Sequence, residues 1–486
     1  MATANDLNIS TWTVQGSSPI RDGEFASGER TSFPPSYLPA ATSRIMYVSD
    51  SGNDGTGAYT DLATVVTPFE PQAAVNEYAT IEAALTQARD GQGDWVLLKR
   101  GDSWTITASL SGALLNGLSS TNTFLLGCYG SSGARPLVQI DDLPVVNFNG
   151  NNYNYWTCYG VEFYAYTRDP NNVSYDNGAS GPDCLRLVGG GDYLTVDDCK
   201  IGFFSESINV DAFDIYNASN VTIKNNILHN SWQLYDGASY CSGVFCEGVV
   251  GLTVEDNVFY NNGWNADVPE VQAHRYTRNH NIYIQHTCDG TDLSVQRNIS
   301  LDASSHGLYV RPGGQVIDNF VARCPVGIEI GYDGFPLASG VNALGEDNVV
   351  IEGVDMDLLD ANPQTSGSIW GINIPIDAEN NGGTVTLTTN VVANRIDSDV
   401  DRGINDPSDI ATKTGNVVYE WWASQDQTDV SWPHPDSVIT DYMTSIGATA
   451  TYTYFVSELL TREVGEIKPL YQAPRINSYF RAGFNL

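Results

Sequence analysis

Two segments of the chain repeat a pattern of residues that could carry acid–base chemistry. Residues 280–285 read HNIYIQ, and residues 306–311 read HGLYVR. Imidazole exchanges protons near neutral pH, phenol can donate a proton, and the guanidinium of arginine is a permanent cation whose shape matches a carboxylate. Cleaving a uronic-acid polymer by β-elimination needs these three functions, namely a base for the C5 proton, an acid for the leaving oxygen and a cation on the substrate carboxylate.

The charge distribution points to the same part of the chain. Between His274 and Arg323 lie four of the six histidines and five arginines against four acids, so this window is net +1, whereas the remaining 18 basic and 54 acidic side chains give −36. An acidic protein needs such a local patch to bind an anionic chain. The candidate catalytic residues are His280, His306, Tyr283, Tyr309 and Arg311, and the candidate substrate-binding residues are Arg275, Arg278, Gln285, Glu329 and Glu247.

A purely structural interpretation of the same residues stays open. Both histidines precede their strands at an even offset, so they could stack inward at a turn, and the two tyrosines could be aromatic filling. The direction in which His280 and His306 point decides between the two interpretations.

Repeats predict the elements that would position these residues. Seven apolar-x-apolar strand cores recur, at 185–187, 213–215, 244–246, 282–284, 308–310, 328–330 and 372–374. A second template ends in asparagine at Asn226, Asn257, Asn298, Asn319 and Asn390. Coils stacked about 4.8 Å apart would bring these asparagines into a hydrogen-bonded ladder. In such a solenoid, one coil separates residues 280–285 from residues 306–311, and Glu329 joins their outer face on the following coil.

The repeats, together with YVS (47–49), GNDG (52–55) and DWVLLKRGD (94–102), resemble the right-handed parallel β-helix proteins of the pectate-lyase type. The resemblance covers roughly residues 46–400 and implies an all-β, right-handed parallel β-helix. That fold serves lyases, hydrolases, epimerases and adhesive spikes. We expect a polysaccharide-degrading enzyme, a lyase whose partner is an anionic polysaccharide, with two alternatives: a glycoside hydrolase and a non-catalytic virion spike or adhesin.

Residues 209–215 (NVDAFDI) are similar to the Asn-Thr-Asp segment of polygalacturonase-type hydrolases, in which paired carboxylates protonate the glycosidic oxygen and activate water. This similarity makes Asp211, Asp214 and Asp236 the alternative hydrolase acids, although the other elements of that family are absent. The HG at residues 306–307 slightly resembles β-helix mannuronan epimerases, whose Asp-Pro-His signature is missing here. No cofactor is required for these reactions. Calcium is possible at Asp50, Asn53 and Asp54, because a Gly-rich turn there supplies oxygen ligands.

Composition suggests how the ends of the array are covered. Residues 1–45 are polar and predict an N-terminal arm, and residues 46–120 predict a cap with a short helix near 78–89 and the first coils. The β-helix is expected over 121–410, followed by a C-terminal capping segment at 411–486. In that segment Val456, Leu459, Leu460 and Val464 fall on one face of a helix that should cover the last coil.

Charge and cysteine content exclude several classes of function. A net charge of −35 argues against nucleic acid and against an anionic membrane surface as partners. The eight cysteines are dispersed without CxxC pairs, so they are expected to be small buried residues rather than zinc ligands. No signal peptide is visible, and we expect an extracellular or virion-associated protein whose oligomeric state the sequence leaves open.

Overall fold

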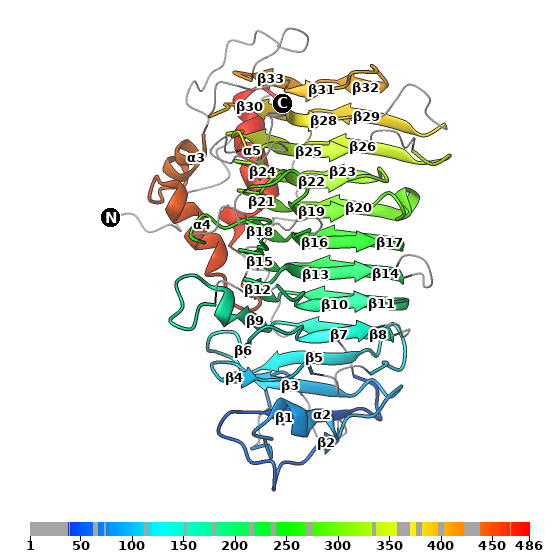
Figure 1. The fold of residues 1–486 in the computed structure, drawn as a ribbon, viewed down its shortest axis with the longest axis vertical. Helices are drawn as coiled ribbons and strands as arrows, with labels where there is room; N and C mark the ends of the chain where they lie inside the picture. Colours follow the sequence, from blue (N-terminus) through cyan, green and yellow to red (C-terminus); the bar gives the residue numbers. More distant parts are fainter. Residues whose placement is uncertain are drawn as a thin grey trace.

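A computed structural model of the chain describes residues 37, 39–61, 67–71, 74–110, 115–149, 153–176, 181–212, 218–234, 240–268, 275–332, 337–356, 370–375, 382–396, 403–421, 438–466 and 468–486. Within these residues the chain winds into a parallel β-helix whose coils stack along one axis (Figure 1). Among the named strands, the pairs are parallel except for β1 with β2 at the N-terminal end.

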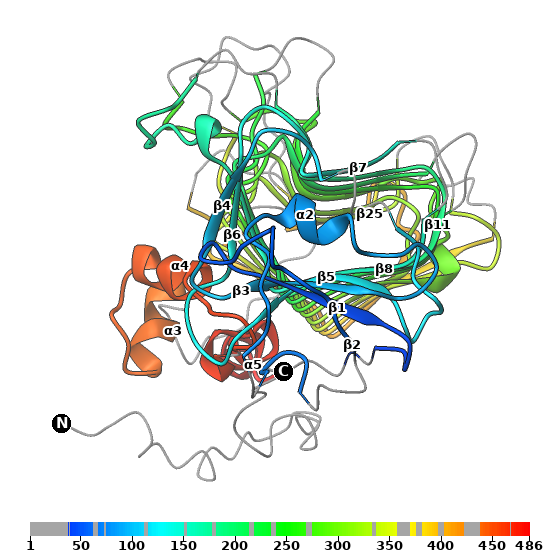
Figure 2. The same ribbon diagram turned by 90° about the horizontal axis from the view of Figure 1, so that it is seen from below.

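Three sheets form the sides of the coil and give it a three-sided cross-section (Figure 2). The thirteen-stranded sheet contains, in spatial order, β2 (Thr60–Asp61), β1 (Arg44–Val48), β3 (Trp95–Lys99), β5 (Phe124–Tyr129), β8 (Tyr153–Tyr159), β11 (Gly191–Asp197), β14 (Ala218–Lys224), β17 (Val249–Glu255), β20 (Leu293–Gln296), β23 (Gln315–Ile317), β26 (Asn342–Glu346), β29 (Thr384–Thr388) and β32 (Ala411–Thr414). The nine-stranded sheet contains β31 (Ile404–Asn405), β28 (Trp370–Asn373), β25 (Val326–Ile330), β22 (His306–Val310), β19 (His280–Ile284), β16 (Ser242–Glu247), β13 (Glu206–Asp211), β10 (Leu185–Val188) and β7 (Val146–Asn149). The eleven-stranded sheet contains β33 (Val417–Tyr419), β30 (Val391–Ala393), β27 (Val349–Ile351), β24 (Phe320–Ala322), β21 (Ile299–Leu301), β18 (Val258–Tyr260), β15 (Ile227–His229), β12 (Lys200–Gly202), β9 (Glu162–Ala165), β6 (Leu137–Ile140) and β4 (Ser103–Ile106).

The interior of the coil is filled by the apolar residues of the repeats. Ile282 and Ile284 of β19 lie in register with Leu308 and Val310 of β22, and all four are buried in one continuous core. Each such side chain contributes about 1.5–3 kcal/mol by leaving water. The eight cysteines are buried too, as expected from their dispersed positions.

The predicted asparagine ladder is present at the corner between two sheets. The Nδ2 of Asn257 donates to Oδ1 of Asn298 at 2.9 Å, and Nδ2 of Asn298 donates to Oδ1 of Asn319 at 3.0 Å. The ladder also includes Asn348 and Asn416, which the sequence template missed. The residue before each of these asparagines has a positive φ, 56° at Arg297 for example, which turns the chain at the corner.

The position in the stack that was predicted for the strand core 213–215 is taken by Ile208 and Val210 of β13, which pair with β10 on one side and with β16 on the other. Both runs fit an apolar-x-apolar template, and the stacking register selects the earlier one. Residues 213–215 lie outside the described part of the chain.

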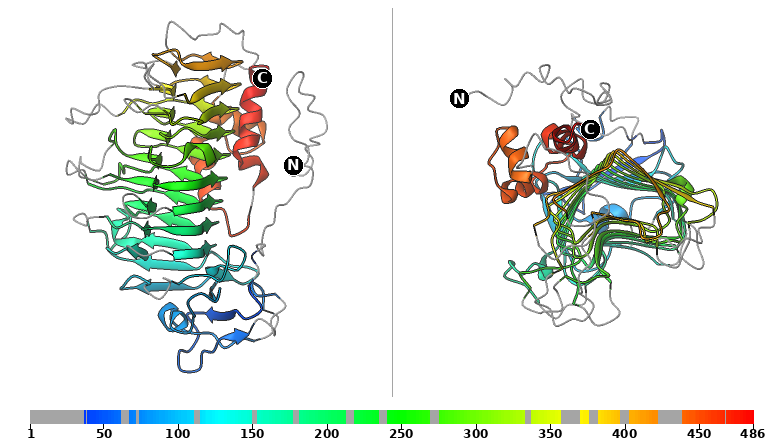
Figure 3. Two further views of the ribbon diagram at one scale, coloured as in Figure 1. Left: turned by 90° about the vertical axis from the view of Figure 1, so that its right-hand side faces the viewer. Right: turned by 90° about the horizontal axis from the view of Figure 1, so that it is seen from above.

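Helices cover the coil at its start and along one flank. α2 (Ile81–Leu85) is shorter than the predicted helix and lies across the N-terminal opening, where Ile81 and Leu85 join the core (Figure 2). α3 (Ile439–Ser445), α4 (Tyr452–Leu460) and α5 (Ala473–Gly483) lie beside the stack (Figure 3). They pack against the outer face of the eleven-stranded sheet from β18 to β33, so the helical cap covers a flank and not the last coil alone.

Three short turns of 3-10 helix complete the described elements: η5 (Tyr166–Arg168), η7 (Gly290–Asp292) and η8 (Pro469–Tyr471). In the described part of the chain, none of the helices combines the length and the apolar character that a membrane crossing requires.

Candidate functional site

The outer face of the nine-stranded sheet carries the candidate residues in two rows that run along the stack. We call the row through the middle of the strands the central row; in register it contains Asn147, Arg186, Asn209, Phe245, Tyr283, Tyr309, Glu329, Asn373 and Asn405. We call the row at the strand starts the leading row; it contains Glu206, Ser242, His280 and His306. The predicted pairing of His280 with His306 and of Tyr283 with Tyr309 is confirmed.

Both histidines point outward, toward the tyrosines. The ring of His280 lies 4.9 Å from that of Tyr283, and the ring of His306 stacks on Tyr309 at 4.4 Å. The inward direction is taken by Asn281, whose Nδ2 donates to Ser300 Oγ at 2.9 Å. Because the chain bends there, Asn281 and Ile282 both face the interior, and the even-offset argument for inward histidines fails.

A chain of hydrogen bonds joins the two histidines to a buried carboxylate. Oε2 of Glu329 accepts from Asn373 Nδ2 at 2.6 Å and lies 3.1 Å from His306 Nε2. Nδ1 of His306 lies 3.1 Å from Nδ1 of His280 and 2.8 Å from Ser305 Oγ. Since a carboxylate can only accept, His306 Nε2 is the donor to Glu329, and His306 Nδ1 faces both Ser305 Oγ and Nδ1 of His280. In the tautomer in which Nδ1–H of His280 donates to His306, the lone pair of His280 is on Nε2.

The guanidinium of Arg311 lies over the aromatic rings of the cluster. It is 4.8 Å from the ring of Tyr283, 4.7 Å from that of Tyr309 and 3.7 Å from that of Tyr332. Its Nη1 donates to Oε1 of Gln285 at 2.5 Å, so these two residues of neighbouring coils are in direct contact. Gln285 also donates to the hydroxyl of Tyr283 at 3.1 Å. The cluster thus holds one cation among phenols, a favourable cation–π arrangement.

Burial shifts the pKa of His280 and the pKa values of the two tyrosines in opposite directions. It lowers the pKa of His280 well below the usual 6.5, and the neighbouring His306 and Arg311 lower it further. Burial raises the pKa of Tyr283 to about 12, and burial together with Glu329 raises the pKa of Tyr309 further. At neutral pH, His280 is therefore an uncharged base and both tyrosines are protonated. Tyrosine is accordingly favoured as the acid of the site and not as its base.

The cluster has a buried floor and a partly exposed rim. His280, Tyr283, Tyr309 and Glu329 are buried, with 2%, 8%, 6% and 5% of their surface exposed. Arg311, Gln285, Phe245 and Tyr332 are half-buried, and His286 is exposed. The ring of His286 stacks on that of Tyr332, with 5.9 Å between the ring centroids. Burial lowers the pKa of His286, and the positive charge of Arg311 lowers it further. A ligand that approaches from solvent would therefore contact Arg311 and the other half-buried side chains before the buried ones.

The structure places the predicted binding residue Arg275 away from this cluster. Its guanidinium lies 4.4 Å over the ring of Trp264 and 3.8 Å from Oδ1 of Asp302, whose other oxygen accepts from Tyr452 of α4. Arg275 thus stabilises the corner next to the C-terminal helices. Arg278 lies beside Tyr240, to whose hydroxyl its Nη1 donates at 3.1 Å.

The predicted hydrolase acids are only partly described. Asp211 ends β13 and lies in register with Glu247 at the end of β16, on the outer face of the same sheet. Asp214 and Asp236 lie outside the described residues.

The predicted calcium turn is held by hydrogen bonds. The carboxylate of Asp54 accepts from the backbone N–H of Ala79 at 2.8 Å and from that of Thr80 at 3.0 Å, at the start of α2. Oδ1 of Asn53 accepts from Gly55, and the N–H of Asp50 donates to Asp102. No group of three or more histidine, cysteine, aspartate or glutamate side chains in the described ranges is arranged to hold a metal ion. Calcium at this turn stays a prediction.

Sequence reasoning missed several residues that surround the histidines and Arg311. Asn373, the hydrogen-bond partner of Glu329, stands at the centre of the seventh strand core, so extending the register by one more coil would have found it. Tyr332 lies beyond the end of β25, where the period of the strand no longer indicates which way a side chain points. Ser305 carries no sequence signal of its own.

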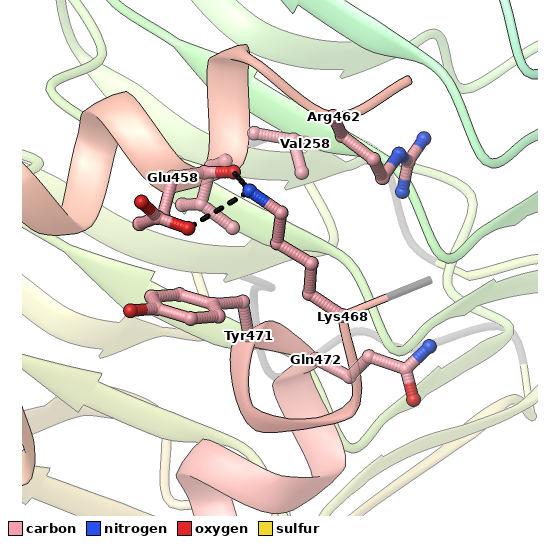
Figure 4. A pocket seen from close by; sticks show the side chains of 7 residues that line it. Val258, Glu458, Arg462, Lys468, Tyr471 and Gln472 are labelled. Atoms are coloured by element: carbon pink, nitrogen blue, oxygen red, sulfur yellow. Dashed lines mark hydrogen bonds and ion pairs between the residues drawn. The ribbon is translucent and has the colours of Figure 1, made fainter. Parts of the chain in front are cut away.

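A hollow lies between the eleven-stranded sheet and the C-terminal helices (Figure 4). It is lined by Val258, Glu458, Leu459, Arg462, Lys468, Tyr471 and Gln472. Lys468 and Glu458 form an ion pair across it at 2.8 Å. None of the predicted site residues lines this hollow.

Comparisons with known proteins agree with the architecture. Residues 183–343 match the family model described as "Right handed beta helix region". No curated protein sequence matches the chain.

Several solved structures match much of the chain at low sequence identity. The A-module of the mannuronan C-5 epimerase AlgE4 from Azotobacter vinelandii is 12% identical over 70% of this chain and 90% of that one, with a TM-score of 0.40. Pectate lyase Pel9A is 14% identical over 82% and 85%, at 0.36. The Dettilon tailspike protein is 14% identical over 77% and 61%, at 0.39. These similarities do not select an activity. The sheet topology and the family match together establish a right-handed parallel β-helix, the fold class expected from the sequence.

Proposed function

We propose that the protein is a polysaccharide lyase that cleaves a uronate-containing polysaccharide by β-elimination at the outer face of the nine-stranded sheet. The observation that carries this proposal is the combination of three groups in one cluster: the uncharged base His280, the protonated phenol of Tyr309 and the permanent cation Arg311. An extracellular or virion-associated setting, where such polymers occur, is part of the proposal.

Each group has one role in the proposed reaction. Arg311 exchanges its bond to Gln285 for the substrate carboxylate, which makes the neighbouring C5–H more acidic. Nε2 of His280 takes the C5 proton, and the electron pair of that bond forms the C4=C5 double bond. The C4–O4 bond breaks, and the Tyr309 hydroxyl protonates the leaving oxygen. Solvent then carries the proton from His280 back to the tyrosine.

Glu329 acts as a positioning residue and not as the substrate-binding residue that the sequence suggested. Its carboxylate fixes the tautomer of His306, which in turn keeps the lone pair of His280 on Nε2. The buried amide of Asn373 holds the same carboxylate oxygen in place.

The test is incubation with alginate, pectate, ulvan and fucoidan while the ultraviolet absorbance of unsaturated uronate is recorded. We expect one of these anionic polymers to give the absorbance. Arg311→Ala should abolish turnover, whereas Arg475→Ala, on α5 of the opposite flank, should retain it; both variants should keep the thermal unfolding of the unaltered protein. Turnover retained by Arg311→Ala would contradict the proposed site.

A glycoside hydrolase is the second candidate, because Asp211 and Glu247 lie side by side in register on the same outer face. Reducing ends that appear without the absorbance would favour it. A protein that cleaves none of the polymers but binds one of them would be an adhesin or spike.

A further inference from the structure

Beyond Tyr309, the central row continues as a line of polar side chains on three successive coils. Glu329 of β25, Asn373 of β28 and Asn405 of β31 lie in register on the outer face of the nine-stranded sheet. Nδ2 of Asn405 donates to Oδ1 of Asn373 at 2.7 Å, and Nδ2 of Asn373 donates to Oε2 of Glu329 at 2.6 Å. The hydrogen bonds that orient the histidines thus extend two coils further, to the half-buried Asn405.

The carboxylate of Glu329 gives this line of hydrogen bonds a direction. A carboxylate only accepts, so the amide of Asn373 must turn its Nδ2 toward Glu329 and its Oδ1 toward residue 405. Residue 405 must therefore supply a donor, which Asn405 does. On its other side the same Oε2 lies 3.1 Å from His306 Nε2, so one carboxylate oxygen accepts from both sides. A flipped Asn373 would bring two acceptors together at Glu329 and two donors together at Asn405.

The asparagines of the corner ladder have a different task. Each of them also donates to a backbone carbonyl, as Asn298 does to Val254 at 2.9 Å, and each follows a residue with a positive φ where the chain turns. Asn373 and Asn405 lie within strands, and the bonds that join them to each other and to Glu329 run between side chains. Because Asn373 is only 1% exposed, its amide depends on protein partners for its orientation.

We infer that Asn405 is a positioning residue of the site: it holds the amide of Asn373 in the orientation that gives Glu329 its second donor. Since β31 lies four coils from β19, Asn405 acts on His280 from about 19 Å away. The inference rests on the proposed function where it treats His280 as the base, whereas the orientation of the amide is independent of any substrate.

The donor that Asn405 orients keeps the neighbouring pair from taking up a proton. A hydrogen bond to a carboxylate stabilises its charged form, so the loss of the Asn373 donor raises the affinity of the Glu329–His306 pair for a proton. With a second proton on Nδ1, His306 would donate to Nδ1 of His280, 3.1 Å away, and the proton of His280 would lie on Nε2. His280 could then not act as the base.

Nuclear magnetic resonance of the imidazole nitrogens tests the inference without substrate, in protein labelled with heavy nitrogen at histidine. Asn373→Ala removes the donor itself, and Asn405→Ala removes only its support. Both should raise the pH at which His306 takes up its second proton, by about one unit, or tenfold in proton affinity, for Asn373→Ala and by at least about half a unit for Asn405→Ala. The other titratable and charged groups around the pair, namely His280, Tyr309 and Arg311, stay the same in every variant.

Asn416→Ala is the matched control. Asn416 belongs to the corner ladder on the same coil as Asn405, and its Nδ2 donates to the carbonyl of Leu387 at 2.8 Å. Its removal should loosen that coil without touching the central row, so the titration of His306 should stay unchanged. Asn405→Asp, which keeps the size of the side chain and exchanges its donor for an acceptor, is the second variant if Asn405→Ala misfolds, and it should raise the same pH at least as much.

The outcomes separate the inference from the proposed function. A His306 titration that is the same in Asn405→Ala as in the unaltered protein, or that shifts as far in Asn416→Ala, would overturn the role of Asn405 and leave the lyase proposal standing. With the active polymer, the acid limb of kcat should move up by the same amount as the titration, while KM stays unchanged. A shifted titration with an unmoved acid limb would uphold the role of Asn405 and contradict His280 as the base.

Discussion

At the scale of single residues, the direction of the His280 side chain decides whether this residue can take part in catalysis or only packs inside the coil. Its ring lies on the outer face because the chain bends at Asn281, so that the successive side chains of Asn281 and Ile282 both face the interior. The neighbours of His280 then decide its protonation. A carboxylate two hydrogen bonds away orients it, and burial keeps it uncharged.

The pH dependence of turnover follows from these groups. Because the pKa of His280 lies well below 6.5, the base stays active as the pH falls through that value. Because the pKa of Tyr283 is about 12 and that of Tyr309 is also raised, the acid keeps its proton on the alkaline side. We expect kcat to be flat from about pH 6 to pH 9. A pH–rate profile with an acid limb centred at or above 6.5 would contradict the assignment of His280.

At the scale of elements, the stacking of coils is held by the asparagine ladder as well as by the core. Asn298 donates to Val254 O and to Asn319, and it accepts from the backbone and the side chain of Asn257. Removing the amide side chain takes away all four of these bonds at once, and the buried backbone N–H of Asn257 loses its acceptor.

Asn298→Ala should therefore lower the free energy of unfolding by about 3 kcal/mol or more. Asn76→Ala, on an exposed position, should change it by less than about 0.5 kcal/mol. Urea unfolding followed by circular dichroism measures both. An Asn298→Ala protein as stable as the control would show that the ladder is dispensable.

Much of the arrangement of the strands could be predicted from the sequence, for a physical reason. Period-two cores and the 26-residue offset between these two segments determine the register of β19 against β22, and the asparagines mark one corner of the coils from β14 to β32. At two places the sequence offers equivalent choices. Residues 213–215 imitate the core of Ile208 and Val210, and an offset from a strand does not reveal a bend at Asn281. The amphipathic face of α4 predicted a helix that covers the coil, but the pattern does not say which surface it covers.

At the scale of the whole molecule, a net charge of −35 opposes any anionic substrate. The attraction of Arg311 acts at short range, whereas the repulsion acts over the screening length, which falls from about 30 Å at 0.01 M salt to about 8 Å at 0.15 M. We expect kcat/KM on a long anionic polymer to rise severalfold over this range. A tetrasaccharide with fewer charges should respond less. A steady fall of kcat/KM from the lowest salt would show that the field at the site is attractive.

The central claim is elimination without water at the cluster of His280, Tyr309 and Arg311. Its most direct test is cleavage of the active polymer in water enriched in heavy oxygen, followed by mass spectrometry of the products. We predict that no heavy oxygen enters the products and that the new non-reducing ends carry a C4=C5 double bond. Incorporation of one heavy oxygen atom per cleaved bond would show hydrolysis and would contradict the account.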